Sequence, residues 1–547
     1  MYGFLDPDYL VQSGAKRFPI VMSRLLLHWG FEEAWSIDGA YDGGADIVAY
    51  LNGERWVIQC KWKQDPTAAV SKAAVAEVAN ARIEYNAHRA MVLTNARFAN
   101  NARSAAHQQP FPIDLVDGES LQKFWASPHF SEKLPGFELR SYQSDAVEAV
   151  RSRLGASDRA LVVMATGLGK TVVMGSYLQT FLRERPGANV LVIANMQPLV
   201  EQLERALWRF LPRSVKTHYL AAGHKPDDVS GVACATIQTA QSYVKQGYAP
   251  ELVIIDEAHH IGADNTLNSI LHALDSVPQL ALTATPWRGD GYALTDRFGS
   301  PAVTISIVDG MKRGYLANVD YRLFADTVPW EKVKAMSQQG YGLKNLNSQL
   351  FLPQRDEKIR DELIGVWSET VNPRAIVFCQ TIEHAQRMER LLSKVPQFKG
   401  AEAVHANLNG RDRQKILLRF RSGETPVIIA VDVLNEGVDV PDVNIVCFAR
   451  VTHSRRIFIQ QLGRGLRVSA GKQSVKVLDF ISDLRRVAAA LAIKRELQGA
   501  TEEVFLPSSH SIEFVNKEAG DLMNEFISEA AEIEDADDSA KLSFPDL

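Results

Sequence analysis

Two glycines, a lysine and a threonine fall within five consecutive residues, in the stretch Ala-Thr-Gly-Leu-Gly-Lys-Thr at 165–171. Gly167 and Gly169 would let the backbone approach an anion closely, and a helix starting just after them would add unpaired N–H groups and a positive dipole end. Lys170 would reach the β- and γ-phosphates of a nucleotide, while the Thr171 hydroxyl would bind Mg²⁺. These residue types at this spacing predict a phosphate-binding loop.

The flanking residues supply the two elements that such a loop requires. An apolar, β-prone stretch occupies 160–164, and a helix-prone stretch follows at 172–182. Strand, glycine-rich turn and helix in this order are the context in which a phosphate loop forms. Met164 stands at the first position of the G-x-x-x-x-G-K-T pattern, in place of glycine. The prediction of a phosphate-binding loop therefore also depends on the flanking strand and helix.

A second group of reactive side chains, Asp46, Gln59 and Lys61, is brought together by a predicted hairpin. Two alternating runs, 42–51 and 54–61, are joined by Asn-Gly, the strongest short hairpin signal. The two-residue turn fixes the register and places Asp46 opposite Gln59, with Cβ atoms about 5 Å apart. Lys61 shares their face because side chains alternate along a strand. The opposite face is apolar and is expected to face the core: Ile47, Ala49, Leu51, Trp56, Ile58 and Cys60.

A carboxylate, an amide oxygen and a lysine on one sheet face can hold Mg²⁺ and a polarised water beside a phosphodiester. The hairpin resembles the restriction-endonuclease fold, specifically Mrr-like nucleases, whose Asp…Gln-x-Lys pattern is matched by Asp46, Gln59 and Lys61. Segments 90–98 and 113–118 are similar to later strands of that family, and the resemblance covers about residues 15–126. It implies a DNA endonuclease with these three catalytic residues, in which the aspartate and the glutamine bind one or two Mg²⁺ or Mn²⁺ ions.

Members of that family often carry a glutamate in the first helix, which we expect here at Phe18 to His28. This segment contains none, and Glu77, Glu32 and Glu33 are the candidate substitutes. Two alternatives therefore stay open: a catalytically silent DNA-binding domain, or a surface hairpin with ordinary polar residues.

Beyond the phosphate loop, apolar strand-like segments starting at Val190, Gly231, Leu252 and Leu280 alternate with helical patterns. This interleaving implies a parallel sheet whose ligands gather at the C-terminal ends of the strands. The acidic pair Asp256-Glu257 stands at such an end.

These segments resemble superfamily 2 helicases and translocases. Asp-Glu-Ala-His at 256–259 matches their second motif, and Thr-Ala-Thr at 283–285 matches their third. The resemblance implies that Asp256 holds Mg²⁺ and that Glu257 orients and deprotonates the attacking water. It assigns these further residues of the first lobe to ATP binding: Arg140, Gln143, Thr166, Gly167, Leu168, Gly169, Lys170 and Thr171.

A second lobe is expected around strands at 374–379 and 427–431. Its segment 432–441 resembles the fifth helicase motif, and 460–467 matches the sixth, Q-x-x-G-R-x-x-R. The resemblance assigns three of its residues to ATP binding (Gly437, Asp439 and Gln460) and two to catalysis (Arg464 and Arg467). Guanidinium groups would stabilise the charge that spreads over the γ-phosphate oxygens during hydrolysis. Because they come from the second lobe, hydrolysis would depend on closure of the cleft.

The helicase resemblance spans about residues 137–482, and its details are similar to RadD-like proteins and type I restriction motor subunits. Loops at 195–198, 236–239, 380–381 and 432–435 would hold the phosphate backbone of single- or double-stranded DNA rather than read its bases. We can assign no role to residues 325–360.

A chain of 547 residues is too long for one core. We predict an α/β protein with a restriction-endonuclease-like domain at 1–128, a linker at 129–137, and two RecA-like parallel-sheet lobes at 138–318 and 319–482. A helical segment with an acidic tail is expected at 483–547. No apolar run approaches the ~18 residues of a membrane span, and the first residues do not resemble a signal peptide, so we expect a cytoplasmic protein without a membrane partner.

The net charge of −5 is concentrated at one end. Ten acidic residues and one lysine from Glu518 to Leu547 carry −9, which leaves +4 on residues 1–517. A slightly basic body is compatible with DNA binding. The four cysteines are far apart and lie in apolar stretches, so buried, reduced thiols are expected.

Three functions fit these residues. The first is an ATP-driven DNA translocase or helicase with its own metal-dependent nuclease, acting in restriction or anti-phage defence with further protein subunits. The second is a DNA repair or recombination motor whose N-terminal domain binds or trims DNA. The third, a scaffold that uses ATP only as a conformational switch, is disfavoured by the full set of hydrolytic residues, and RNA as the track is a minor alternative.

Overall fold

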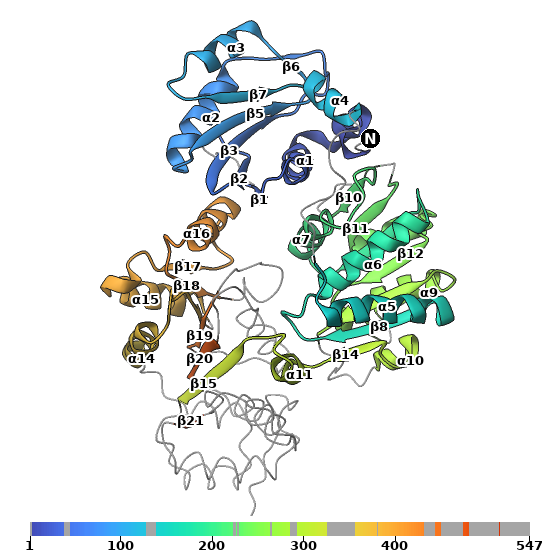
Figure 1. Ribbon diagram of the computed structural model, residues 1–547, viewed down its shortest axis with the longest axis vertical. Helices are drawn as coiled ribbons and strands as arrows, with labels where there is room; N and C mark the ends of the chain where they lie inside the picture. The colour runs from blue at the N-terminus through green and yellow to red at the C-terminus, as the bar shows by residue number, and fades with distance from the viewer. Residues whose placement is uncertain are drawn as a thin grey trace, which may run out of the picture.

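The computed structural model describes residues 3–37, 44–126, 138–221, 226, 229–262, 265–284, 293–324, 356–379, 381–431, 443–449, 474–480 and 513–514. An N-terminal α/β domain lies across the ends of two lobes, each built on a seven-stranded sheet (Figure 1). The predicted fold class, an endonuclease-like domain followed by two parallel-sheet lobes, is confirmed. The predicted linker lies outside the described residues, as does the expected C-terminal segment apart from one short strand.

The N-terminal domain is a five-stranded sheet of order β1-β2-β3-β5-β7 with helices on both faces. The first three strands are antiparallel and the last three are parallel. The strands are β1 (Glu33–Ser36), β2 (Ile47–Leu51), β3 (Glu54–Lys61), β5 (Arg89–Thr94) and β7 (Ile113–Val116), with the short pair β4 (Ala69–Val70) and β6 (Arg97–Phe98) beside them. The helices are η1 (Gly3–Leu5), α1 (Pro7–His28), α2 (Ala73–Glu84), α3 (Asn100–His107) and α4 (Gly118–Ala126).

The hairpin register predicted from Asn-Gly is confirmed. Leu51 pairs with Glu54 and Ile47 with Ile58, and the turn residues Asn52 and Gly53 have φ of +51° and +75°. This geometry matches the two-residue turns whose twist fits that of the flanking strands. The apolar face packs against α1, as expected. The other face is also covered, by α2 and α3, so the polar hairpin residues lie beneath a helix rather than on an open surface.

The first helix begins earlier than predicted. It runs from Pro7 rather than Phe18, and its N-cap Asp6 accepts from the N–H groups of Asp8 and Tyr9. Gly14, with φ +70° and ψ 170°, interrupts the helical geometry. The prediction was wrong because Pro19 was taken as a first-turn residue, whereas it lies inside the helix, after the break at Gly14.

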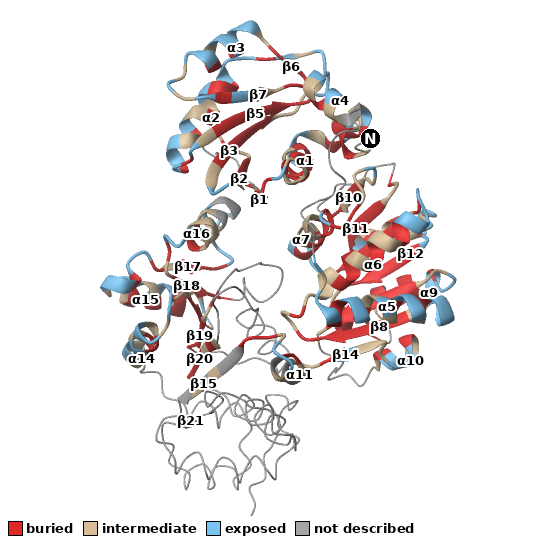
Figure 2. Ribbon diagram, in the orientation of Figure 1, coloured by how far each residue is buried: buried red, intermediate tan, exposed pale blue. Residues whose placement is uncertain are grey.

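Lobe 1 is a parallel sheet of order β10-β11-β9-β12-β13-β8-β14. Side chains alternate between two cores, one under α5, α6 and α7 and the other under α8, α9 and α10, which explains the nearly continuous apolar strands. Figure 2 shows these strands buried between the two helical layers. The strands are β8 (Arg159–Met164), β9 (Val190–Ala194), β10 (Thr217–Leu220), β11 (Val232–Thr236), β12 (Leu252–Ile255), β13 (Gln279–Thr283) and β14 (Val303–Ile305). The helices are α5 (Ser141–Ser157), α6 (Lys170–Glu184), α7 (Gln197–Leu207), α8 (Ile237–Lys245), η2 (Ala258–His260), α9 (Thr266–Ala273), α10 (Leu294–Phe298) and α11 (Ile307–Lys312).

Lobe 2 repeats this architecture with the order β17-β18-β16-β19-β20-β15-β21. Helices α14 and α15 pack on one face of its sheet, and α16 packs on the other. The strands are β15 (Asn318–Phe324), β16 (Ala375–Phe378), β17 (Glu402–Val404), β18 (Val427–Ala430), β19 (Ile445–Phe448), β20 (Ser474–Phe480) and β21 (Glu513–Phe514). The helices are α14 (Asp356–Ser368), α15 (Ile382–Leu392), η3 (Pro396–Phe398) and α16 (Gly410–Ser422).

The N-terminal domain is docked on lobe 1 through buried polar contacts of α1. Arg17 binds both oxygens of Glu204 on α7, at 2.6 and 2.7 Å, and the two side chains are only 9% and 1% exposed. The Tyr9 hydroxyl donates to the carbonyl of Thr217, and the Arg24 guanidinium donates to that of Val215 at 2.8 Å. Buried ionic groups of this kind need every partner, because removing one leaves the other uncompensated.

The ion pairs of the same domain with lobe 2 are more exposed than its pair with lobe 1. Lys415 on α16 forms an ion pair with Glu84, and Arg55 on β3 binds Glu424 at 3.1 Å. The Arg421 guanidinium lies over the Trp35 ring, 3.5 Å from its centroid. The N-terminal domain therefore bridges the two lobes, with most of its buried polar contact on lobe 1.

Candidate active sites

The turn between β8 and α6 has the backbone of a phosphate loop. Gly167 and Gly169 have φ of +92° and +84°, in a region that side-chain-bearing residues rarely adopt. A Cβ atom at Gly169 would lie 2.6 Å from Nε2 of Gln143, so a larger residue would push this amide away from the Leu168 carbonyl. The Lys170 ammonium donates to the carbonyl of Met164 at 3.3 Å, which is long for a charged donor. The lysine is therefore held only weakly over its own loop.

The first turn of α5 supports this loop from below. The Tyr142 hydroxyl and the Gln143 amide both donate to the carbonyl of Leu168, each at 3.1 Å. The Gln143 side chain in turn accepts from the Arg140 N–H at 3.1 Å. Tyr142 also stacks on Tyr315, with ring centroids 4.1 Å apart. Arg140, Gln143 and Leu168, which the sequence assigned to one site, are thus brought together by hydrogen bonds.

Asp256 and Glu257 follow β12 directly and lie near the phosphate loop. Glu257 adopts a left-handed backbone with φ +49°, and its carboxylate lies 3.2 Å from Nδ1 of His259. Burial acts to raise the pKa of Glu257, but the nearby Lys170 charge and the His259 contact outweigh it and lower the pKa to about 2. Glu257 is therefore ionised at neutral pH.

Hydrogen bonds join the ends of three neighbouring strands around this acidic pair. Nδ1 of His259 lies 3.2 Å from the hydroxyl of Thr283, which ends β13. Asn195, just after β9, lies 2.7 Å from the His260 ring. These contacts bring the predicted second and third motifs together, at the strand ends where a parallel sheet binds its ligands.

The other half of the predicted nucleotide site falls outside the described residues. Gln460, Arg464 and Arg467 belong to it, as do Gly437 and Asp439. Their assignments remain predictions.

For lobe 1, the Thr166 hydroxyl is a buried polar group without a partner among the described atoms, which fits a site that takes a further polar ligand.

Two of the three hairpin residues, Asp46 and Gln59, are in direct contact, and Lys61 lies on the same face of β3 as Gln59. The Gln59 amide donates to Oδ2 of Asp46 at 2.6 Å, and the Cys60 N–H donates to the same oxygen at 2.6 Å. Gln59 is only 3% exposed, and its Oε1 is buried without a donor among the described residues. A buried oxygen that lacks a donor, next to a carboxylate, fits a bound cation. Within the described residues, no three His, Cys, Asp or Glu side chains form a metal-binding group.

Lys61 points from this face to α2, where its ammonium lies 2.5 Å from Oε2 of Glu77. The sequence had offered Glu77, Glu32 and Glu33 as substitutes for a missing glutamate. Glu77 is the one that contacts the cluster, whereas Glu32 accepts from the Asn52 N–H and Glu33 from the Trp35 indole. Which of the three glutamates reaches Lys61 depends on how α2 packs on the sheet, and no local sequence signal specifies that packing.

Other contacts of the site residues could not be read from the sequence. Tyr315 lies 173 positions after Tyr142 along the chain, and neither its type nor its spacing marks it as a partner. His259 belongs to the recognised motif, but its contact with Thr283 depends on the strand order of the folded sheet.

Three family models match separate stretches of the chain. Residues 11–125 match the family model described as restriction endonuclease. Residues 136–288 match the model described as type III restriction enzyme, res subunit, and residues 354–469 match the helicase conserved C-terminal domain. None of the described helices combines the length and apolar composition that a membrane span requires.

Individual relatives are distant. IRC3 of Saccharomyces cerevisiae, named as an ATP-dependent helicase, is 27% identical over 358 residues, or 63% of this chain and 51% of that protein. The endonuclease subunit of the type I restriction enzyme EcoAI of Escherichia coli is 27% identical over 403 residues, covering 68% of this chain and 48% of that protein. The chain thus spans about half the length of these curated relatives. A solved structure of the type ISP restriction-modification enzyme LlaBIII bound to DNA has a TM-score of 0.49 at 19% identity, covering 88% of this chain and 37% of that one.

The matched families, their order along the chain and the two parallel-sheet lobes lead to one assignment: the chain joins an Mrr-like restriction endonuclease domain to the two lobes of a superfamily 2 helicase.

Proposed function

We propose that this protein is an ATP-driven DNA translocase or helicase with its own metal-dependent DNA endonuclease, acting in the restriction of invading DNA. The observation that carries the proposal is that two reactive clusters lie on domains docked together in one chain. One is the phosphate loop with Asp256 and Glu257, and the other is Asp46 with Gln59 and Lys61. The restriction-enzyme names of relatives such as the EcoAI subunit support the defence role.

In the motor, Lys170 would exchange its weak bond to the Met164 carbonyl for the β- and γ-phosphates of ATP. Thr171 and Asp256 would hold Mg²⁺, which supplies positive charge to the phosphate oxygens when bound. Glu257 would orient the attacking water by accepting a hydrogen bond. The Lys170 charge that lowers the pKa of Glu257 would then lie on the phosphates, which leaves Glu257 a stronger base than it is without nucleotide.

The second lobe would complete this site. Arg464 and Arg467 would stabilise the charge of the transition state, while Gly437, Asp439 and Gln460 would contact the nucleotide. Because these groups and Lys170 come from opposite lobes, ATP binding and hydrolysis would drive relative motion of the lobes along the DNA backbone.

In the nuclease, Asp46 and the buried Oε1 of Gln59 would hold a divalent cation. When bound, such an ion activates water and neutralises phosphodiester oxygens. Lys61 would bind the phosphate that is cut, once its ammonium leaves Glu77. The short bonds from Gln59 and Cys60 already fix the Asp46 carboxylate in place, so release of Lys61 from Glu77 is the rearrangement that the site still needs.

Two substitutions test the two halves of this proposal. Lys170→Ala should lower DNA-stimulated phosphate release at least ~100-fold, the scale of losing one transition-state donor. Lys245→Ala, on an exposed position of α8, is the matched control and should leave the rate unchanged. If the wild type and Lys170→Ala release phosphate at equal rates, Lys170 is not part of the ATPase site and the motor half of the proposal is wrong.

Asp46→Ala should abolish cleavage of plasmid and linear DNA in Mg²⁺ or Mn²⁺ while phosphate release continues. Asp114→Ala, which removes an exposed carboxylate from β7 of the same domain, is the control. If the Asp46 variant cuts DNA as fast as the control, the Asp46 cluster is not the cutting site and the nuclease assignment is wrong. If neither the wild type nor the variants cut DNA, a repair motor whose N-terminal domain grips DNA becomes the better description.

A further inference from the structure

The nuclease domain is held by the two lobes to very different degrees. On lobe 1 its Arg17 and Glu204 form a pair that is almost completely buried. On lobe 2 the Lys415 and Glu84 side chains are 21% and 36% exposed, and Glu424, the partner of Arg55, is 51% exposed. Exposed ion pairs are weak and exchange readily with water. When the lobes move relative to one another, the nuclease domain should therefore stay with lobe 1 and slide or separate at lobe 2.

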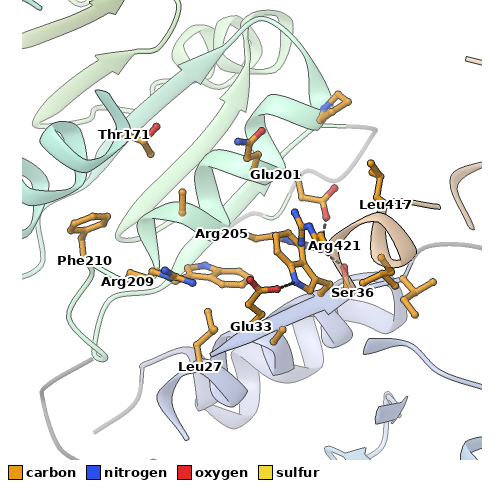
Figure 3. Close-up of a pocket in the computed structure, with 18 of the residues that line it drawn as sticks. Leu27, Glu33, Ser36, Thr171, Glu201, Arg205, Arg209, Phe210, Leu417 and Arg421 are labelled. Carbon is orange, nitrogen blue, oxygen red and sulfur yellow. Dashed lines mark hydrogen bonds and ion pairs between the residues drawn. The ribbon is translucent and has the colours of Figure 1, made fainter. Parts of the chain in front are cut away.

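Space for such movement lies next to the weak contact. A cavity of about 510 Å³ separates α16 of lobe 2 from α7 of lobe 1, below β1 of the nuclease domain. Figure 3 shows Leu417 and Arg421 on one side of it and Glu201 and Arg205 on the other. The cavity leaves room for α16 to approach lobe 1, and the Arg421 guanidinium, now packed over Trp35, would shift with it. Any such approach would shift α16 against the nuclease domain.

Helix α16 contacts β1 through Arg421 and Trp35, and it also contacts α2, the helix that reaches the cluster of Asp46, Gln59 and Lys61. Glu84 at its end pairs with Lys415, and the Lys415 ammonium lies 5.3 Å from the centroid of the Tyr85 ring that follows. Glu77, seven residues or two helical turns earlier, pairs with Lys61, and the two side chains are 42% and 30% exposed, so this pair too can exchange. Residues spaced by seven lie on the same side of a helix. One rigid helix thus joins lobe 2 to the lysine of the nuclease cluster.

Helix α2 is also packed against the loop that leads to Asp46. A Cβ atom at Gly44 would lie only 2.2 Å from the carbonyl oxygen of Glu77, so the two backbones are in direct contact. Gly44 has φ +86°, which favours glycine independently. A shift of α2 would therefore act on both the lysine and the carboxylate side of the cluster.

We propose that α2 couples the position of lobe 2 to the nuclease: in the arrangement of lobes seen here, the α16 contact keeps Glu77 on Lys61 and restrains cleavage. Movement of lobe 2 upon nucleotide binding shifts α2, releases Lys61 from Glu77 and permits cleavage. Glu77, Glu84 and Lys415 are positioning residues in this scheme, which rests on the proposed nuclease function. DNA cutting would thereby be confined to molecules whose motor is engaged.

The test is to break the contact and measure cleavage without nucleotide. Because the pair is exposed, Lys415→Ala should raise nucleotide-free cleavage about two- to fivefold, and Lys415→Glu, which adds repulsion with Glu84, about tenfold. The combined variant Glu84→Lys with Lys415→Glu restores an ion pair and should return cleavage to the wild-type dependence on ATP. Lys394→Ala, at an exposed position of the same lobe, is the matched control. DNA-stimulated phosphate release should stay unchanged in all four, which also shows that they are folded.

A second measurement uses the wild-type protein. A zero-length carbodiimide reagent joins a carboxylate and an amine that are in contact, and a Glu84–Lys415 cross-link can be quantified by mass spectrometry. Its yield should fall when a non-hydrolysable ATP analogue and DNA are added. An unchanged yield, or nucleotide-free cleavage by Lys415→Glu at or below the wild-type level, would overturn the coupling.

Failure of the underlying function gives a different result. Asp46→Ala in the Lys415→Glu background should remove all cleavage. If cleavage persists in that double variant, the nuclease assignment fails. If it disappears while Lys415→Glu alone keeps the wild-type dependence on nucleotide, the nuclease stands and only the coupling is wrong.

Discussion

The strongest test of the domain arrangement is to remove the charge of Glu204 with the isosteric change Glu204→Gln. Glu204 is 1% exposed and is bound by two bonds from Arg17 and one from the Thr217 hydroxyl at 2.7 Å. Without its charge, the Arg17 guanidinium stays buried and uncompensated. Breaking a buried pair in this way costs about 3–5 kcal/mol. The nuclease domain should then separate from lobe 1 much more often.

Cysteine labelling can measure that separation. Ser13 on α1 is 9% exposed and lines a small gap with Arg17 and Thr217, so a thiol at Ser13→Cys should react only when the domains part. The four native cysteines are all buried, which keeps the background low. A loss of about 3–5 kcal/mol corresponds to labelling roughly 100- to 4000-fold faster, since each 1.4 kcal/mol is a factor of ten.

The matched control is Glu184→Gln on the exposed face of lobe 1. Glu184 pairs with Arg151 at 2.8 Å, a comparable distance, but the two side chains are 54% and 56% exposed. That change should raise labelling by less than about fivefold. The double change Arg17→Met with Glu204→Leu should recover most of the protection, because well-packed apolar groups often replace a buried pair without loss. If Glu204→Gln and Glu184→Gln label at the same rate, the docking does not depend on this pair.

Three further predictions concern the pH dependence and two glycines. Burial acts to raise the pKa of Glu204, but the Arg17 charge outweighs burial and the pKa is lowered. The ionised Glu204 therefore stabilises the fold above the ordinary glutamate pKa of about 4.3, and this stabilisation is lost as the pH falls below that value. The melting temperature of the wild type should fall between pH 5 and 3 more steeply than that of Glu204→Gln. Gly169→Ala should weaken ATP binding at least tenfold in a titration, because a left-handed alanine backbone costs about 1–2 kcal/mol and the alanine Cβ would meet Gln143. Gly187→Ala has a similar φ in open space and should leave ATP binding unchanged. Gly44→Ala should abolish DNA cleavage but not DNA-stimulated phosphate release, because its Cβ would collide with the Glu77 carbonyl and push the backbone that carries Asp46 out of place. Equal cleavage by this variant and by Gly53→Ala, in an open turn, would contradict this packing.

Patterns of a few residues were sufficient where the structure is local. Asn-Gly between alternating runs fixed the hairpin register, so the proximity of Asp46 and Gln59 followed from counting along two strands. The strand, loop and helix around Lys170 follow equally from residues within about 25 positions. The start of the first helix was predicted wrongly because Pro19 was taken as a first-turn residue. The helical residues before it, which begin at Pro7 and include a break at Gly14, were therefore left out.

What the sequence by itself determined is therefore the set of chemically reactive groups and the elements that carry them, since both depend on near neighbours along the chain. Only the tertiary structure decided that Arg17 meets Glu204, that Glu77 rather than Glu32 or Glu33 reaches Lys61, and that Lys415 meets Glu84 across 331 positions. Such pairs form because whole faces of helices and sheets become buried together, and no spacing of charged residues along a chain records which faces those will be.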